Sequence, residues 1–436
     1  MTSALQSSFR FAPLFTAQAL GLPPSLAPRV DAVLETLGDR AAGRDRDGGS
    51  LAKELRALAE LGVTSARLAT AQGGLGWSYA QNVDLLIALA RADSSAAQSL
   101  RSHFLYVEHL VRHPELPGNA FGVAEVAGGK LFASATTEIG PVAVGAVGTT
   151  VAPDGQGRLR LNGSKFYTTG AGYADWVNVF AADTEGTHIL ATVALEDQGV
   201  TVVDDWDGVG QRLTMSGTMQ FEQVLVDPAR VRPRARSEDT PSGLQDAMAQ
   251  LTHLATLTGI AIRAFEDAAA WLHGRKRHFS HAAASVPADD PLVQEQVGRL
   301  EAVAGTALLA VRSAALQLQT PRDNALGDPY ADGHRAVTQL QVVLPALVLD
   351  ATQALFDIGG GSMVVAARGL DRHWRNARTL ASHNPSPQKA RVLGNEALNG
   401  VPLPTIWYAG TAAGAPANAA APAQTQTQTL AVEARP

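Results

Sequence analysis

The chain contains no cysteine, and only five of its 436 residues are methionine. The absence of cysteine excludes disulfide bonds, thiolate metal sites and a cysteine nucleophile. Two explanations account for so little sulfur. One is economy of sulfur in a protein made when sulfur is scarce, and the other is a composition biased toward alanine and arginine. Both stay open at this point.

Long apolar runs and a strong excess of charge are also absent. The longest apolar segment, residues 340–356, is interrupted by Gln341, Pro345, Asp350 and Gln353, so no transmembrane helix is predicted. The first ten residues have neither a basic nor an apolar region of the kind found in signal peptides, so we expect a cytoplasmic protein. A net charge of −6 without a basic cluster argues against a nucleic-acid partner.

The pattern of apolar residues changes twice along the chain. Up to about residue 130 it is helical, with Ser-x-x-Gln capping boxes that begin at Ser78 and Ser95. Short segments rich in β-branched residues follow, separated by glycine, asparagine and aspartate, as is typical of strands. Long apolar helices then return. We expect an α+β multidomain chain with a lead-in (1–25), a helical domain (26–130), a β domain (131–235), a second helical domain (236–408) and a disordered tail (409–436).

Residues 161–175 form the most distinctive stretch. Asn162-Gly163 predicts a two-residue hairpin turn, because both central positions of that turn need φ > 0. Alternating residues on either side, at 158–161 and 176–180, predict strands for both arms. Small and hydroxylated residues at 167–172 would let a flat ligand approach the backbone closely. The alternative is an ordinary hairpin in a β domain.

Five motifs occur in an order that resembles the acyl-CoA dehydrogenase superfamily over residues 20–400. They are Gly73-Gly-Leu-Gly76, Ala135-Thr-Thr-Glu138, Lys165-Phe-Tyr-Thr-Thr-Gly170, Trp206-Asp-Gly-Val-Gly210 with Ser216-Gly217, and Arg375-Asn-Ala-Arg378. The resemblance implies an acyl-CoA dehydrogenase-like fold, with an N-terminal helical domain, a middle β-barrel and a C-terminal four-helix bundle. It also implies a homotetramer.

The same resemblance assigns four residues to a flavin. Thr169 is expected beside flavin N5, where its hydroxyl can accept from a reduced flavin or donate to an oxidised one. Ser134 and Thr137 are expected along the pyrimidine edge, and Trp206 near the isoalloxazine ring. The alternative for each is a satisfied strand hydroxyl or a core indole.

The features of an acyl-CoA dehydrogenase are incomplete. The glutamate that removes the substrate α-proton in that family falls at Asn384, and an amide cannot act as that base. Residues 247–258, where some members place the glutamate, contain no acid. The Gly-Ser-Asp that helps to hold CoA is replaced by Ile139-Gly-Pro-Val-Ala-Val144. We therefore expect no oxidation of acyl-CoA.

Residues 370–379, 383–385 and 394–400 resemble instead the flavin-dependent monooxygenase branch, which contains dibenzothiophene monooxygenase and sulfur-acquisition oxidoreductases. The resemblance places His383 near flavin C4a and His103 across the pocket. Leu380 stands where dibenzothiophene monooxygenase has another histidine. A histidine with a near-neutral pKa could protonate the oxygenated flavin.

The branch implies a two-component monooxygenase that uses reduced FMN, rather than FAD, and O₂. It acts through a flavin C4a-hydroperoxide, with an organosulfur compound as the leading substrate. Lys276, Arg277 and Arg372 are candidate ligands of the flavin phosphate, although Arg277 also fits a solvated basic helix end. No Gly-x-Gly-x-x-Gly motif follows a strand, so a separate NAD(P)H:flavin reductase is expected. The competing hypotheses are an acyl-CoA dehydrogenase or related flavin oxidoreductase, and a non-catalytic flavin-binding scaffold.

Overall fold

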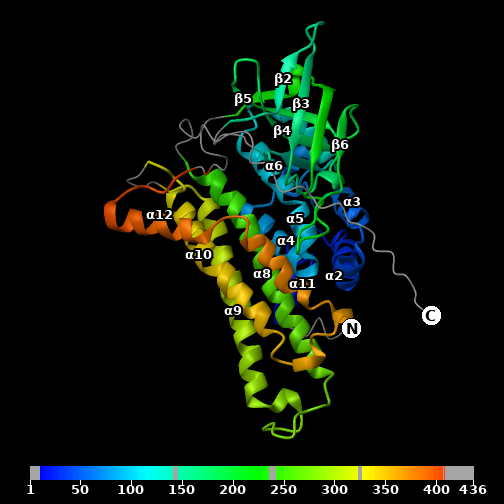
Figure 1. Cartoon of the computed structure of the whole chain (residues 1–436), viewed down its shortest axis with the longest axis vertical. Coiled ribbons are helices and arrows are strands. Elements are labelled where there is room, and N and C mark those ends of the chain that lie inside the picture. Colours follow the sequence, from blue (N-terminus) through cyan, green and yellow to red (C-terminus); the bar gives the residue numbers. More distant parts are fainter. Residues whose placement is uncertain (1–9, 141–145, 235–241, 323–326, 406, 408–436) are drawn as a thin grey trace, which may run out of the picture.

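The computed structural model describes residues 10–140, 146–234, 242–322, 327–405 and 407. Within them, a strand-rich part lies at one end of the molecule and long helices extend away from it. The amino-terminal helices pack beside the junction of the two (Figure 1). This order of helices, strands and helices confirms the predicted α+β fold class.

The amino-terminal part is helical, as predicted. Its α-helices are α2 (Ala27–Asp47), α3 (Ala52–Glu60), α4 (Tyr79–Ala92), α5 (Ser94–Ser99), α6 (Arg101–Arg112) and α7 (Asn119–Ala127). The first capping box is confirmed, because Ser78 Oγ accepts from the Gln81 N–H and the Gln81 side chain accepts from the Ser78 N–H. The second box is wrong. The carboxylate of Asp93 accepts from the Ser95 N–H at 3.0 Å and caps α5 in its place.

The middle part is one sheet, and its strands hydrogen-bond in the order β6-β7-β3-β2-β4-β5-β8, with β1 pairing in parallel with β4. Buried valine, alanine and leucine side chains from these strands form its core. The strands are β1 (Phe132–Ala135), β2 (Thr150–Pro153), β3 (Leu159–Lys165), β4 (Trp176–Ala182), β5 (His188–Ala194), β6 (Val200–Val202), β7 (Met219–Leu225) and β8 (Val231–Pro233).

The hairpin turn predicted at Asn162-Gly163 is wrong. β3 runs through both residues, and the pairing with β7 shifts there in a β-bulge. Gly163 has φ +149° and supplies the bulge, and a Cβ on it would lie 2.4 Å from Thr149 Oγ1. Asn162 Oδ1 accepts from the Gln223 N–H at 2.8 Å. The two predicted arms are both strands, but β2 lies between them.

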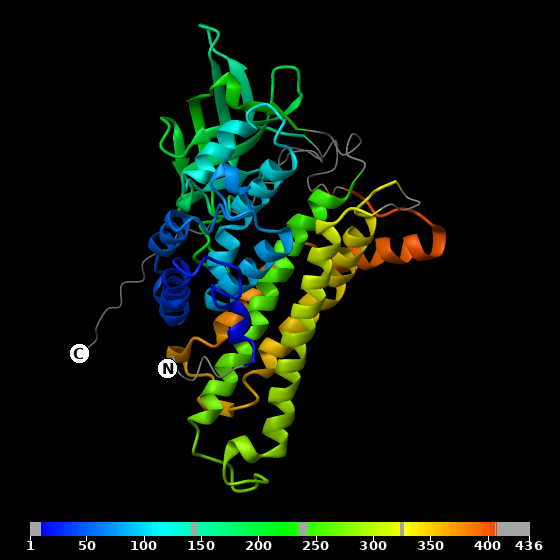
Figure 2. The same ribbon diagram turned by 180° about the vertical axis from the view of Figure 1, so that it is seen from behind.

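The carboxy-terminal part is helical and is built around α8. Its helices are α8 (Leu244–His273), α9 (Pro291–Gln319), α10 (Ala331–Ala354), α11 (Asp371–Ala381) and α12 (Ser386–Asn399). Helix α8 is buried along most of its length and contacts α4, α9 and α10. The amino- and carboxy-terminal helices therefore share one apolar core, while α12 extends to the side of the bundle (Figures 1 and 2).

Short 3₁₀ segments join these elements. They are η1 (Ala12–Phe15), η2 (Thr70–Gln72), η3 (Ala171–Tyr173), η4 (Pro228–Arg230), η6 (Pro287–Asp289), η7 (Gly360–Ser362) and η8 (Ala366–Arg368). In the described part of the chain, no helix combines the length and apolarity needed to cross a membrane. The disordered tail expected at 409–436 lies outside the described residues.

Candidate functional site

A chain of hydroxyl groups starts at Thr169, in the loop between β3 and β4. Thr169 Oγ1 lies 2.9 Å from Ser216 Oγ, which lies 2.7 Å from Thr214 Oγ1. Thr214 Oγ1 in turn donates to the Gln211 carbonyl at 2.8 Å. All three hydroxyl residues are buried. Each hydroxyl has one proton, so this last bond sets the direction of the others: Ser216 donates to Thr214, and Thr169 donates to Ser216.

The Thr169 loop is fixed against α5. Gly170 has φ +82°, and a Cβ at this position would lie 2.1 Å from the Ser99 carbonyl oxygen. Thr168 Oγ1 donates to the Gly217 carbonyl at 2.9 Å. Only glycine combines this backbone conformation with such a close approach. The loop therefore joins the sheet to the helical core at the point where Thr169 lies.

Of the other residues assigned to the flavin ring, Trp206 and Thr137 connect to the same loop, whereas Ser134 lies opposite Asn178 of β4. Trp206 Nε1 donates to the Gln211 carbonyl at 2.8 Å, so the indole and the hydroxyl chain share one acceptor. Ser134 lies half-buried on β1, and Thr137 is exposed and bridges to Phe166, next to the loop. The structure thus groups Trp206 with Thr169, and brings Thr137 to the strand that leads into the loop.

A second group of polar side chains lies where α8 meets the segment after α11. His383 is exposed, and its ring centre lies 4.1 Å from that of His253 on α8. Asn384 Nδ2 lies 3.1 Å from His383 Nδ1 and donates to Gln250 Oε1 at 2.5 Å. An amide nitrogen can only donate, so Nδ1 of His383 accepts and its proton is on Nε2. Desolvation against α8, followed by the charge of Arg101, lowers the pKa of His383 below its ordinary value, although solvent reaches part of this exposed side chain.

His103 lies on α6 and is only 1% exposed. Its Nε2 lies 3.1 Å from the Thr64 carbonyl, and its Nδ1 accepts from the Phe132 N–H at 3.2 Å. Burial lowers its pKa to about 4. Both ring nitrogens are therefore engaged by the backbone, and the ring joins α6 to the start of β1. The catalytic role assigned to His103 stays a prediction.

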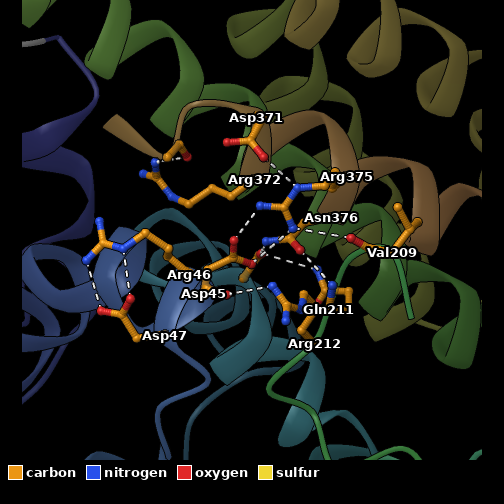
Figure 3. Close-up of polar contacts among 12 residues, drawn as sticks. Asp45, Arg46, Asp47, Val209, Gln211, Arg212, Asp371, Arg372, Arg375 and Asn376 are labelled. Atoms are coloured by element: carbon orange, nitrogen blue, oxygen red, sulfur yellow. Dashed lines mark hydrogen bonds and ion pairs between the residues drawn. The ribbon is translucent and has the colours of Figure 1, made fainter. Parts of the chain in front are cut away.

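The Arg375-Asn376 pair of the last motif holds the loop that carries Trp206. Asn376 Oδ1 accepts from the Gln211 N–H at 2.6 Å, and Arg375 donates to the Val209 carbonyl at 3.2 Å (Figure 3). Arg375 also pairs with Asp45 of α2. The motif thus fixes one side of the site through backbone groups.

Sequence-family models identify this architecture. The model for the acyl-CoA dehydrogenase middle domain matches residues 132–224, and the model for the acyl-CoA dehydrogenase C-terminal domain matches residues 251–386. The two ranges together span more than half of the chain. The chain belongs to the acyl-CoA dehydrogenase family.

Similar members of the acyl-CoA dehydrogenase family carry monooxygenase names. The probable FMNH₂-dependent monooxygenase SfnC of Pseudomonas putida is 28% identical over 381 residues, covering 82% of this chain and 91% of SfnC. The dibenzothiophene monooxygenase of Rhodococcus qingshengii is 28% identical over 389 residues, 84% of this chain and 91% of that enzyme. The FMN-bound structure of TdsC from Paenibacillus sp. A11-2 superposes with a TM-score of 0.80 at 26% identity, covering 88% of this chain and 99% of TdsC.

The structure also bears on the carboxylate that an acyl-CoA dehydrogenase needs. Asn384 stands at the expected position, and Asp246 at the start of α8 is a nearby acid whose charge acts on His383. Asp246 lies 3.5 Å from Lys389 Nζ and 3.8 Å from His334 Nε2. Burial alone would raise its pKa, but these partners lower it below the usual range. A carboxylate held so acidic is a poor base for a carbon acid.

The three candidate phosphate ligands do not converge in one chain. Arg277 and Lys276 are exposed and follow α8 in the chain, and the carboxy-terminal end of α8 lies far from the sheet (Figure 1). Arg372 is buried on α11, where it donates to the Gly369 carbonyl and to Asp267, each at 2.8 Å. The charge of Arg372 is thus balanced inside the protein. The assignment of these residues to the flavin phosphate stays a prediction.

Sequence reasoning missed His253 and Arg101. His253 lies in a helix that is apolar nearly all round, and so reads as a core residue. Arg101 is a lone cation at the first position of α6. Nothing in the sequence indicates that α8 brings the two together with His383.

Proposed function

We propose that this chain is an FMNH₂- and O₂-dependent two-component monooxygenase that acts on an organosulfur compound. A separate NAD(P)H:flavin reductase would supply its FMNH₂. The monooxygenase names of SfnC, dibenzothiophene monooxygenase and TdsC support this class. The expected cytoplasmic location stays a prediction.

The direction of the hydroxyl chain is the observation that carries the proposal. The only proton of the Thr169 hydroxyl is donated to Ser216, which leaves lone pairs on Oγ1 to face a ligand. Reduced flavin carries a proton on N5, whereas oxidised flavin has a lone pair there. A group that can only accept therefore favours the reduced form. Reversing the chain would cost the bond from Thr214 to Gln211, about 1 kcal/mol or roughly fivefold in affinity.

Residues of this chain suit a flavin, which when bound would supply the oxygen-activating chemistry. Thr169 would accept from N5, Trp206 would pack near the ring, and Ser134 and Thr137 would take the pyrimidine edge. His383 holds a proton on Nε2 and is neutral at neutral pH, because its pKa is lowered. It would therefore offer a neutral N–H donor on the side of the ring away from Asn384.

We also propose a homo-oligomer, with the homotetramer implied by the resemblance as the expected form. Large apolar side chains on α9 and α10 are exposed in the single chain, including Leu309 at 72% and Leu316 at 56% on α9. Two leucines seven residues apart lie on the same face of a helix. Residues 26–130, 131–235 and 236–408 would be the three domains of each copy.

Comparing Thr169 variants by flavin binding tests the proposal. The wild type is expected to bind FMNH₂ at least about fivefold more tightly than FMN under anaerobic conditions. Ser216→Ala frees the Thr169 proton and should reduce this preference, and Thr169→Val should abolish it. Thr192→Val removes a buried hydroxyl of β5 that bonds to Asn178, and serves as the control. Equal preference in the wild type and in Ser216→Ala would contradict the directional argument.

Oxygen reactivity separates the competing functions. The complex with FMNH₂ is mixed with oxygenated buffer in a stopped-flow spectrometer, without substrate. The proposal expects a transient spectrum distinct from both reduced and oxidised FMN. If oxidised FMN reappears directly, at the rate seen with free flavin, the monooxygenase proposal is wrong. Anaerobic bleaching of bound oxidised flavin by an acyl-CoA would favour a dehydrogenase, and failure to bind either form of FMN would favour a scaffold.

A further inference from the structure

Arg101 is a cation without an acidic partner among the described residues. It is the first residue of α6, its Nε is buried, and no other residue in the described part of the chain forms a hydrogen bond or ion pair with its side chain. Burial lowers its pKa to about 10, and Asp246, whose charge acts on it, is already engaged by Lys389 and Gln250. Arg101 is half-buried, and the unpaired part of its guanidinium is the Nε–H, which has lost water without gaining a partner.

Other polar atoms around Arg101 are unpartnered too. His253 is 5% exposed, and both of its ring nitrogens are buried without a hydrogen-bond partner. Its ring centre lies 4.1 Å from that of His383, and α5 and α6, which adjoin at Arg101, both contact α8. Burial, followed by the charges of His383 and Arg101, lowers the pKa of His253. Gln98 on α5 also keeps a buried amide oxygen without a partner. Buried polar groups are rarely left unpaired without a ligand or an ordered water.

These unpartnered groups differ from the polar groups of the Thr169 loop. The hydroxyl chain from Thr169 is satisfied within the protein except for its acceptor end, whereas Arg101 and His253 together lack both hydrogen bonds and charge balance. A neutral ligand would leave the guanidinium unpaired. An oxyanion would balance the charge and accept hydrogen bonds from Arg101 and from a histidine N–H.

We propose that Arg101 and His253 form a subsite for an oxyanion group of the substrate, so that the preferred organosulfur substrate carries a sulfinate or sulfonate group instead of being neutral. The inference rests on the proposed function. Because the rings of His253 and His383 are 4.1 Å apart, the bound group would hold the remainder of the substrate beside His383. Arg101 sets the sign of the charge, and His253 contributes a hydrogen bond.

Two probes of nearly equal shape test this subsite. Methanesulfonate and dimethyl sulfone differ in that a charged oxygen of one is a methyl group in the other. Isothermal titration of each into the full chain with bound FMN should show that methanesulfonate binds more tightly by about tenfold or more. Arg101→Gln is expected to weaken methanesulfonate roughly 10- to 100-fold and to leave dimethyl sulfone unchanged. Arg29→Gln removes an exposed arginine of α2 and serves as the control.

Further variants guard against a folding defect. Arg101→Lys keeps the charge and should retain most of the preference for methanesulfonate, whereas a loss equal to that of Arg101→Gln would overturn the charge argument. His253→Gln should weaken methanesulfonate less than Arg101→Gln does. Equal binding of the two probes to the wild type would overturn the proposal. So would an Arg101→Gln variant that loses FMN and keeps methanesulfonate, because Arg101 would then serve the flavin phosphate.

Failure of this inference and failure of the proposed function give different results. The oxygen transient is measured on the wild type without substrate, and the titrations measure probe binding. A normal transient with equal binding of both probes rejects the oxyanion subsite alone. Tight, charge-dependent binding without a transient supports the subsite and rejects the monooxygenase.

Discussion

The ion pair between Asp45 and Arg375 provides a direct test of how α2, α11 and the loop carrying Trp206 are held together. Asp45 is 6% exposed, and the Arg375 side chain is 18% exposed. The same helix carries a matched pair two residues further on, Arg46 with Asp47, whose side chains are 51% and 63% exposed (Figure 3). Replacing each aspartate by asparagine removes the same negative charge from a buried ion pair in one case and from an exposed ion pair in the other.

The expected loss of stability follows from what Arg375 keeps. Breaking a buried ion pair costs about 3–5 kcal/mol, because a charge stays buried without its partner. In Asp45→Asn, however, Arg375 retains Asp371 at 2.7 Å and the Val209 carbonyl at 3.2 Å. We therefore expect a smaller destabilisation, about 2–3 kcal/mol. At about 2.1 cal/mol/K per residue, a chain of this length would unfold about 2–3 °C lower. Asp47→Asn should show no measurable change.

Thermal unfolding of both variants beside the wild type measures this difference. Hydrogen exchange adds a local readout, because the Gln211 N–H is held by Asn376 beside Arg375. Exchange at Gln211 should be faster in Asp45→Asn and unchanged in Asp47→Asn. Equal melting temperatures for the two variants would refute the reasoning, since burial would then not distinguish the pairs.

Two further substitutions test the packing around the site. Gly170→Ala should lower the melting temperature and weaken FMN binding, because its Cβ would lie 2.1 Å from the Ser99 carbonyl oxygen. Gly62→Ala is the control, because Gly62 also has a positive φ, +72°, but a Cβ there would lie 3.8 Å from its nearest neighbour, Ser65 Oγ. Asp267→Asn should destabilise the protein most at neutral pH. Burial alone would raise the Asp267 pKa, but nearby guanidinium groups, including that of Arg372, lower it well below its usual range. Its stabilisation is therefore present above the unfolded pKa of about 3.9 and is lost as pH falls below it, so the two melting curves should converge in acid.

The sequence allowed the fold to be predicted where local signals and tertiary structure agree. The Ser78 box and the change from helical to strand periodicity depend on near neighbours, and both are confirmed. The turn predicted at Asn162-Gly163 was wrong because the positive φ that glycine allows suits either a hairpin turn or a β-bulge. The capping box predicted at Ser95 was wrong because the carboxylate of Asp93, two residues earlier, caps the helix instead. The choice between turn and bulge, and between the two capping residues, depends on neighbouring strands and side chains that a local sequence pattern does not contain.

The site was harder to predict, because its parts lie far apart in the chain. Thr169 and His383 could be proposed from the resemblance, and their roles stay predictions. The partners that give them chemical direction, Ser216 for the first and Asn384 for the second, become informative only when hydrogen bonds are known. Arg101 and His253 carried no signal, since a lone cation and a lone histidine in an apolar helix are usually structural.

The three histidines near the site can nevertheless be ranked by one criterion, the number of ring nitrogens left free by the protein. Each has a lowered pKa and is neutral at neutral pH, so charge does not separate them. His103 has both nitrogens engaged by backbone groups, His383 has one next to Asn384, and His253 has neither engaged. A neutral imidazole can act on a ligand only through a nitrogen that the protein has not already used. By this argument His103 positions α6 and β1, His383 presents one N–H, and His253 has the largest unmet capacity to bind a ligand.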